Sequence, residues 1–393
     1  MMRIRRNALI TLQALVEGYP VVAVTGPRQS GKTTLVQAAF PDRPYANLED
    51  LEIREHATSD PKGFLASFPD GAVLDEVQRA PDLFSELQVR VDAERRPGLF
   101  VLTGSQQFNL LAGVTQSLAG RIALVPLLPF SLGELTRDRH APERLEDLLW
   151  RGLYPPVHDR RLNPRIWYGN YVQTYLERDL RQLIAIRDLS NFQRFLRMCA
   201  ARSGQLLNLS GLANDCGVTH NTARAWISVL EASYLVHLLR PHHANLGKRL
   251  VKTPKLYFTD PGLAAWLLGI ENCDQVATHA QRGALFETWL VSDLLKARFN
   301  SGLASNLFFW RSRSGLEIDV LAERGTRLVA AEAKSGQTLA GDFFGPLEKW
   351  CALAGKTESS SWLVYGGTKE QQRRRIHVLS WKDISALERA VAD

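Results

Sequence analysis

Eight consecutive residues near the start of the sequence have the types and spacing needed to hold a polyphosphate. They match the pattern G-x-x-x-x-G-K-[ST] and are Gly26, Pro27, Arg28, Gln29, Ser30, Gly31, Lys32 and Thr33. The two glycines let the backbone wrap so that successive N–H groups point at an anion. In this arrangement Lys32 reaches the terminal phosphates and the Thr33 hydroxyl ligates Mg²⁺. A chance match in a glycine-rich turn is the alternative, and the flanking elements must decide between the two.

The residues on either side supply the strand and the helix that this motif requires. Residues 21–25 are apolar and largely β-branched, which predicts a buried parallel strand. The residues from Thr34 onwards continue as a helix that ends before Pro41. We therefore predict that the N-terminus of this helix, Thr34 included, also faces the phosphates.

Two carboxylates end a second apolar strand, at residues 71–76. Phosphoryl transfer needs one carboxylate to hold the Mg²⁺ shell and another to orient or deprotonate the attacking water. We assign Asp75 to the metal and Glu76 to the water, so Glu76 is a predicted catalytic residue. The alternative is that the strand simply ends here and Asp75 caps a helix. This alternative is disfavoured because a complete phosphate motif precedes the strand.

Two more polar residues border strands of the same expected sheet. Residues 99–103 predict a buried strand, and Ser105 follows at the edge where open α/β sheets bind ligands. Ser105 is therefore a candidate sensor of the γ-phosphate, although a helix N-cap explains it equally well. Arg121 precedes a strand at residues 122–127 and is a candidate for placing positive charge on the transferring phosphoryl group. An ordinary surface arginine is the reading that the sequence alone favours for it.

Composition sets the frame for these motifs. A chain of 393 residues with 45% apolar and 23% charged residues is expected to form two or three globular domains. Its formal charge of +7 permits a nucleic-acid partner without requiring one. The four cysteines are scattered, the basic N-terminus makes a poor signal peptide, and no apolar run is long enough to span a membrane. These features predict a cytoplasmic protein with no membrane partner.

The combined motifs resemble a prokaryotic family of AAA-type ATPases that carry a C-terminal domain of unknown function. The resemblance covers nearly the whole chain and rests on residues 26–33, 74–78, 102–105, 117–121 and 128–135. It implies an α/β fold with a P-loop parallel sheet, ATP as the ligand, and a relation to ATPases that act as switches as well as motors. We place this ATPase domain at residues 1–135.

Residues 136–275 are predicted to form a helical and winged-helix region. Residues 209–219 and 220–230 read as two helices joined by a glycine turn, which is a helix-turn-helix signature. Residues 235–239 and 255–259 are the expected wing strands. DNA contact would use basic wing residues and a few readers on the second helix, namely Lys248, Arg249, Lys252, Lys255, His220, Asn221 and Arg224. A lid or packing module is the alternative, because most of the second helix is apolar.

Residues 276–393 resemble the PD-(D/E)XK nuclease family, which implies a restriction-endonuclease-like α/β domain. Glu287 lies in an apolar helix, Asp319 in a strand, and Glu332 with Lys334 on one face of its hairpin neighbour. By this resemblance Asp319 and Glu332 bind Mg²⁺, Glu287 completes the metal site, and Lys334 positions or activates water for phosphodiester hydrolysis. The alternatives are a charged pair on an edge strand, or a nuclease fold reused for binding.

These predictions combine into a Mg²⁺-dependent ATPase whose nucleotide state positions a winged-helix unit and a nuclease-like domain on nucleic acid. A second hypothesis is a nucleotide-gated interaction protein with slow turnover and an inert C-terminal fold. A third is a sequence-reading regulator. The sequence leaves open the pathway, the oligomeric state, and whether Arg121 acts in cis or in trans.

Overall fold

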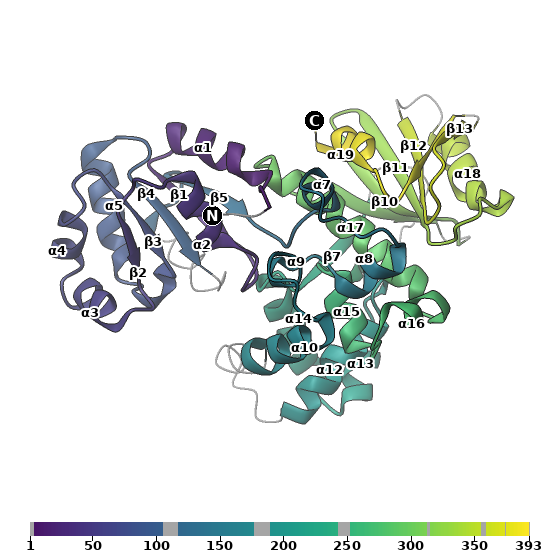
Figure 1. Ribbon diagram of the computed structural model, residues 1–393, viewed down its shortest axis with the longest axis horizontal. Coiled ribbons are helices and arrows are strands. Elements are labelled where there is room, and N and C mark those ends of the chain that lie inside the picture. Colours follow the sequence, from purple (N-terminus) through teal and green to yellow (C-terminus); the bar gives the residue numbers. More distant parts are fainter. Residues whose placement is uncertain are drawn as a thin grey trace. The chain divides into compact units, whose positions relative to one another are not determined.

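The computed structural model describes residues 4–104, 117–176, 189–242, 252–312, 315–354, 359–373 and 375–392 (Figure 1). Contacts between residues divide the chain into two units. The first unit comprises the described residues of Met1–Phe130 with Ala232–Tyr234 and Phe299–Leu303, and the second comprises those of Ser131–Glu231, Leu235–Arg298 and Ala304–Asp393. Both units combine helices with a sheet, so the predicted α/β class is confirmed.

The first unit is built on a five-stranded sheet in the order β2-β3-β4-β1-β5, and every neighbouring pair is parallel. The strands are β1 (Val21–Thr25), β2 (Tyr45–Asn47), β3 (Ala72–Asp75), β4 (Phe100–Gly104) and β5 (Ile122–Pro126). Four of them, β1, β3, β4 and β5, fall where the sequence predicts strands. Because the strands are parallel, their carboxyl ends meet at one edge of the sheet.

Helices cover both faces of this sheet, which explains why its three central strands, β3, β4 and β1, are buried along their whole length (Figure 1). They are α1 (Ala8–Gly18), α2 (Lys32–Ala39), α3 (Leu51–Ser59), α4 (Pro61–Ala66) and α5 (Leu83–Glu94), with a 3-10 turn at Val77–Arg79. Alternate residues of β1 serve opposite cores. Val22 and Val24 pack with the side chains of α1 and α2, whereas Val21 and Ala23 pack with those of α3, α4 and α5.

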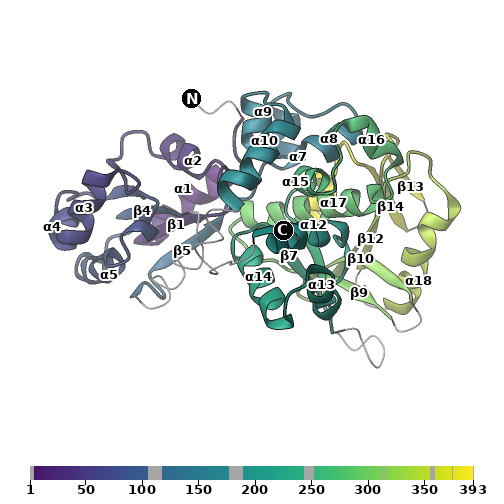
Figure 2. The same cartoon turned by 90° about the horizontal axis from the view of Figure 1, so that it is seen from below.

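In the second unit, helices come first along the chain, and most strands of a large sheet follow in its C-terminal part (Figure 2). Its helices are α7 (Leu132–Arg137), α8 (Leu145–Arg151), α9 (Pro155–Asp159), α10 (Pro164–Tyr171), α12 (Leu189–Ala201), α13 (Leu209–Cys216), α14 (His220–Ala232), α15 (Pro261–Leu267), α16 (Cys273–Thr278), α17 (Arg282–Asn300), α18 (Gly345–Ala354) and α19 (Ser385–Ala392). A π-helical turn at Val172–Leu176 and a 3-10 turn at Gly341–Phe344 complete the set. No helix among the described residues is long and apolar enough to cross a bilayer.

The sheet of the second unit has nine strands in the order β13-β14-β12-β11-β10-β9-β7-β8-β6. They are β6 (Gln205–Leu206), β7 (Val236–Pro241), β8 (Lys255–Phe258), β9 (Leu307–Arg311), β10 (Glu317–Arg324), β11 (Arg327–Lys334), β12 (Ser359–Tyr365), β13 (Gln371–Arg373) and β14 (Ile376–Ser380). Strands β10 and β11 form the expected antiparallel hairpin. The parallel pair of β7 and β9 makes the sheet continuous across the two regions that the sequence predicts as separate domains.

The helix-turn-helix pattern of the sequence corresponds to α13 and α14. Gly217, which separates them, has φ +66°, a left-handed conformation that suits glycine at a helix end. The apolar residues of α14 are buried, and Trp226 packs edge-on against Phe192 and Phe195 of α12.

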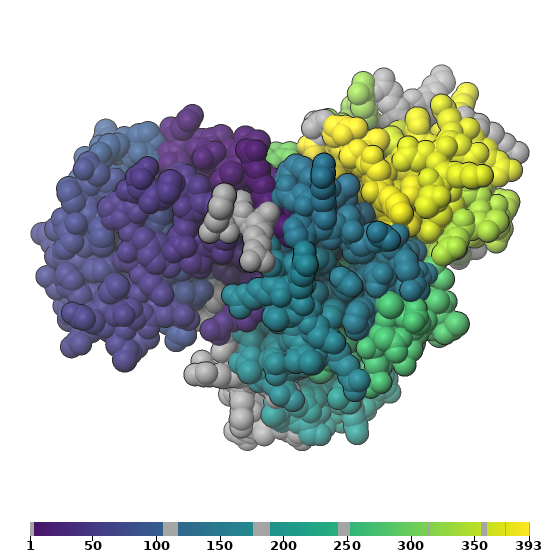
Figure 3. Space-filling view, viewed as in Figure 1, coloured from purple at the N-terminus to yellow at the C-terminus, as the bar shows by residue number. Residues whose placement is uncertain are grey.

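Figure 3 shows the surface of the second unit's C-terminal strands and of α19 in yellow and yellow-green, where their atoms form one continuous surface.

Candidate functional site

The loop between β1 and α2 has the backbone shape of a phosphate cradle. Gly26 has φ +143°, and a Cβ atom there would lie 2.1 Å from the backbone oxygen of Leu127. Gln29 and Gly31 also have positive φ, at 62° and 93°. Only glycine tolerates the close approach at the first of these positions, so the glycine of the motif is required by packing as well as by the turn.

Buried polar groups in this loop lack the partner that an anion would supply. The Ser30 side-chain oxygen is buried without a hydrogen-bond partner. The Lys32 ammonium is 5% exposed and donates to the backbone oxygens of Gly26 and Pro27, at 3.1 and 3.0 Å. Burial lowers the pKa of Lys32 to about 8, against the opposing charges of Glu76 and Asp75. These features fit a polyphosphate, because negative oxygens would restore the charge and hydrogen bonds that burial removes.

The side chain of Asp75 is held by hydroxyl groups from three different elements. Thr33 Oγ1 of α2 donates to Asp75 Oδ2 at 2.9 Å, and Tyr45 at the start of β2 donates to the same oxygen. Thr103 of β4 donates to the other oxygen, Oδ1. Thr33 and Asp75, the two predicted metal ligands of this unit, therefore touch each other directly. A hydroxyl and a carboxylate are the oxygen ligands that Mg²⁺ uses in such sites.

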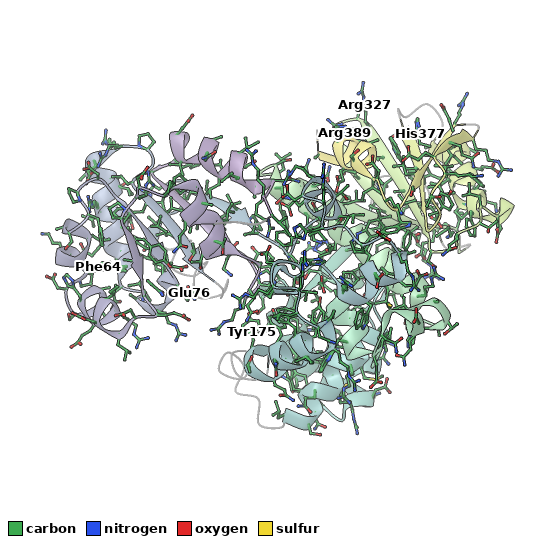
Figure 4. All side chains as sticks on the ribbon, in the orientation of Figure 1. Phe64, Glu76, Tyr175, Arg327, His377 and Arg389 are labelled. Carbon is green, nitrogen blue, oxygen red and sulfur yellow. The ribbon has the colours of Figure 1, made fainter. Side chains whose placement is uncertain are left out.

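Glu76 lies at the end of β3, where Figure 4 labels it. Its φ of +55° is left-handed, which is uncommon for a residue other than glycine. The Glu76 N–H donates to Thr103 Oγ1 at 3.2 Å, and its carboxylate accepts a hydrogen bond from Gln78. These two contacts fix both the backbone and the side chain of the residue expected to orient water.

Arg6 fixes the cradle from outside the motif. Its guanidinium, 4% exposed, donates to the backbone oxygens of Ser30 at 2.8 Å and Leu128 at 2.6 Å. It also lies 4.9 Å from the centre of the Phe130 ring, within cation–π range. Thus one buried arginine ties the phosphate loop to the segment that leaves β5.

The other predicted residues of the first unit are placed as follows. Arg28 pairs with Glu49 at 3.7 Å, and Thr34 is exposed on the first turn of α2. Arg121 forms an ion pair with Asp92 of α5, with 2.9 Å between Nη2 and Oδ2. This ion pair is consistent with an ordinary surface arginine, and the catalytic role of Arg121 stays a prediction. Ser105 lies outside the described residues.

In the second unit, the structure brings the predicted nuclease-like residues into one region. We call Glu287 of α17, Glu317 and Asp319 of β10, and Glu332 of β11 the carboxylate cluster. Lys334 Nζ lies 2.6 Å from Glu332 Oε1, and the Ala333 N–H donates to Asp319 Oδ2 at 2.9 Å. Burial raises the pKa of Glu287 to about 7 and that of Glu332 to about 8, and the charge of Asp319 acts in the same direction.

A lysine that the sequence assigned to a DNA-binding wing lies inside this cluster. Lys255 is only 3% exposed and cannot reach a phosphate backbone, so that assignment is wrong. Burial alone would lower the pKa of Lys255, but the charges of Glu287, Asp319 and Glu317 raise it overall. Across the described ranges, no three His, Cys, Asp or Glu side chains are grouped so as to hold a metal ion together.

Several of these contact residues carry no sequence signal of their own. Tyr45 and Thr103 contact Asp75 from the neighbouring strands, and Arg6 contacts the loop and the segment after β5, so their partners become apparent only in the folded chain. Tyr234, which the contacts assign to the first unit, shares a 2.9 Å hydrogen bond with Thr25 beside the cradle. Only Thr103 could have been suspected, because it is a polar residue at the carboxyl end of a predicted strand.

Comparison with known families agrees with this geometry. The model of a family described as an AAA domain matches residues 18–136. Two further models, both described as domains of unknown function, match residues 142–274 (DUF8612) and 282–384 (DUF4143). The parallel sheet, the loop after β1 and the AAA domain match together define a P-loop ATPase of the AAA type.

The chain belongs to the family of two mycobacterial relatives, the uncharacterized proteins Rv2008c of Mycobacterium tuberculosis and Mb2031c of Mycobacterium bovis. Each is 35% identical to it over 340 residues, which are 85% of this chain and 74% of the relative.

Matches among solved structures include the Walker-type ATPase PABY2304 of Pyrococcus abyssi, with 16% identity, a TM-score of 0.47, and coverage of 68% of this chain and 96% of that one. AMPPCP-bound DnaA from Aquifex aeolicus is also 16% identical, with a TM-score of 0.30 and coverage of 57% and 85%.

Proposed function

We propose that this AAA-type ATPase binds ATP together with Mg²⁺ at the loop of residues 26–33 and hydrolyses the γ-phosphate. The observation that carries the proposal is the buried ammonium of Lys32, which among the described residues donates to two loop carbonyls while burial lowers its pKa to about 8. Triphosphate oxygens are the partners that would stabilise its charged form.

The side chains of this unit divide the work of hydrolysis. Lys32 would turn from the loop carbonyls to the phosphates, and Thr33 with Asp75 would hold the metal. Mg²⁺, when bound, supplies charge that stabilises the transferring phosphoryl group. Glu76 would orient the attacking water and accept its proton, with its position fixed by Thr103 and Gln78. No role is proposed here for Arg121, because it is paired with Asp92.

Lys32→Ala tests this proposal. The variant should lose ATP binding, measured with a fluorescent ATP analogue, and should lose ATP hydrolysis. Lys62→Ala, at an exposed lysine on α4 of the same unit, is the matched control and should keep both. The assignment fails if Lys32→Ala binds and hydrolyses ATP as the control does.

We further propose that the nucleotide state controls a winged-helix module acting on DNA. The order of α12, β6, α13, α14, β7 and β8 supports the winged-helix interpretation, and Asn221 and Arg224 are exposed on α14. Lys252 is exposed as well, whereas Lys248 and Arg249 lie outside the described residues. DNA-dependent stimulation of ATP hydrolysis supports this coupling, and rates that are equal with and without DNA argue against it.

A second candidate function is a nucleotide-gated switch whose nuclease-like fold is catalytically inert. It is favoured by the Lys255 ammonium, which lies among the carboxylates that would otherwise bind metal. Mg²⁺-dependent DNA cleavage that is lost in Asp319→Asn would refute this candidate and restore the nuclease hypothesis.

A further inference from the structure

Lys255 lies among carboxylates that the nuclease resemblance assigns to a metal. Its Nζ lies 2.9 Å from Glu287 Oε1 and 4.0 Å from Asp319 Oδ1, and it also pairs with Glu317. These carboxylates come from α17 and β10, whereas the lysine comes from β8. One ammonium group thus joins three elements of the second unit.

The surroundings of Lys255 hold the ammonium in place. Its Nζ lies 5.9 Å from the centre of the Tyr257 ring and 5.6 Å from that of Phe309, at distances typical of cation–π contacts. The Tyr257 hydroxyl donates to Glu287, so the same ring that faces the cation also orients its carboxylate partner. A lysine that is 3% exposed gains nothing from water and depends on these groups for its charge.

An ammonium and a divalent metal would compete for the same oxygens. A metal bound by Glu287 and Asp319 would lie within a few ångströms of Lys255 Nζ, where two positive charges repel strongly in a buried site. The ammonium, in contrast, donates hydrogen bonds to several carboxylates at once. Lys255 therefore supplies positive charge to Glu287, Glu317 and Asp319, while Arg311 pairs with Glu317 and Lys334 pairs with Glu332.

We propose that Lys255 is the resident cation of the carboxylate cluster, and that the cluster is an ion-paired joint between β8, α17 and β10 in place of a Mg²⁺ centre. This inference deepens the second candidate function and is independent of ATP binding in the first unit. It implies that removing the lysine charge converts the joint into a site for divalent or trivalent cations.

Terbium luminescence tests the proposal, because Tyr257 can sensitise a Tb³⁺ ion bound by Glu287. All proteins carry Asp75→Asn to weaken the metal site predicted in the first unit, and no nucleotide is added. We expect little Tb³⁺ signal from the parent protein and an affinity higher by about tenfold or more in Lys255→Met, because one repelling charge is gone. Mn²⁺ should likewise raise the melting temperature of Lys255→Met more than that of the parent.

Two matched variants distinguish the effect of the Lys255 charge on metal binding from the effect of side-chain packing. Lys255→Arg keeps the positive charge and should not gain Tb³⁺ binding, whereas adding Asp319→Asn to Lys255→Met should remove the gain. A folded Lys255→Met protein with no gain in affinity refutes the proposal.

If Lys255→Met does not fold, metal binding to the parent protein tests the proposal instead. Stoichiometric Tb³⁺ or Mn²⁺ binding to the parent that disappears in Asp319→Asn would show that the cluster is a metal site despite the lysine. Absence of such binding supports the proposal. Neither result depends on whether the first unit hydrolyses ATP.

Discussion

Replacing Arg6 with methionine should destabilise the first unit and weaken nucleotide binding together. The guanidinium makes two buried hydrogen bonds to the backbone oxygens of Ser30 and Leu128 and one ring contact with Phe130. Hydrogen bonds from a charged donor contribute about 1.5–3 kcal/mol each, and the ring contact about 0.5–2 kcal/mol. Methionine fills much of the space but leaves both oxygens unpaired, so we expect a loss of about 3.5 kcal/mol or more.

Urea denaturation followed by fluorescence measures this loss. With an m-value of about 1–3 kcal/mol per molar urea, the unfolding midpoint of the first unit should fall by roughly 1 M or more. Arg5→Met is the matched control, because Arg5 is the exposed neighbour of Arg6 and should change the midpoint little. ATP affinity should also fall, by roughly tenfold, because the freed loop must be ordered when ATP binds. Equal midpoints for the Arg6→Met and Arg5→Met proteins would refute the reasoning.

Two further predictions concern pH. Burial lowers the pKa of Lys32 to about 8, and phosphate favours the charged ammonium, so ATP affinity should fall by up to about tenfold per pH unit above pH 8. ATP binding should also take up a proton, which calorimetry in two buffers of different ionisation enthalpy detects. An affinity that does not change between pH 8 and 9.5 contradicts this prediction. Burial, and then the charges of Asp293 and Glu134, raise the pKa of Glu388 in α19 to about 8, so the folded state retains a proton that the unfolded chain has released. The free energy of unfolding should therefore fall as pH rises from about 4.5 to 8, by up to about 1.4 kcal/mol per unit of pKa shift, and Glu388→Gln should flatten that dependence. Unfolding curves of both proteins at pH 5 to 8 measure the difference, and parallel pH profiles would contradict it.

Local patterns were enough to predict most of the first unit. Apolar runs bounded by glycine and polar residues located four of the five strands, and the phosphate motif identified the loop between β1 and α2. The hairpin of β10 and β11 was also predicted, because alternation along each strand is a local property.

What could not be predicted depends on which strands become neighbours. Tyr45 and Thr103 reach Asp75 only because β2 and β4 lie on either side of β3. Lys255 looked like a wing residue, since nothing near it in the sequence shows that β8 is close enough to α17 for contact with Glu287. Such contacts join residues tens of positions apart, and periodicity carries no information about them.

The continuous nine-stranded sheet of the second unit has a consequence for how this architecture is inherited. The two stretches matched by separate domains of unknown function supply adjoining strands, β7 and β9, and share the ion pair between Lys255 and Glu287. Either stretch without the other would leave a row of backbone hydrogen-bonding groups open to water and a charged side chain without its counterpart. We therefore expect residues 142–274 and 282–384 to be inherited together, although two separate family models describe them.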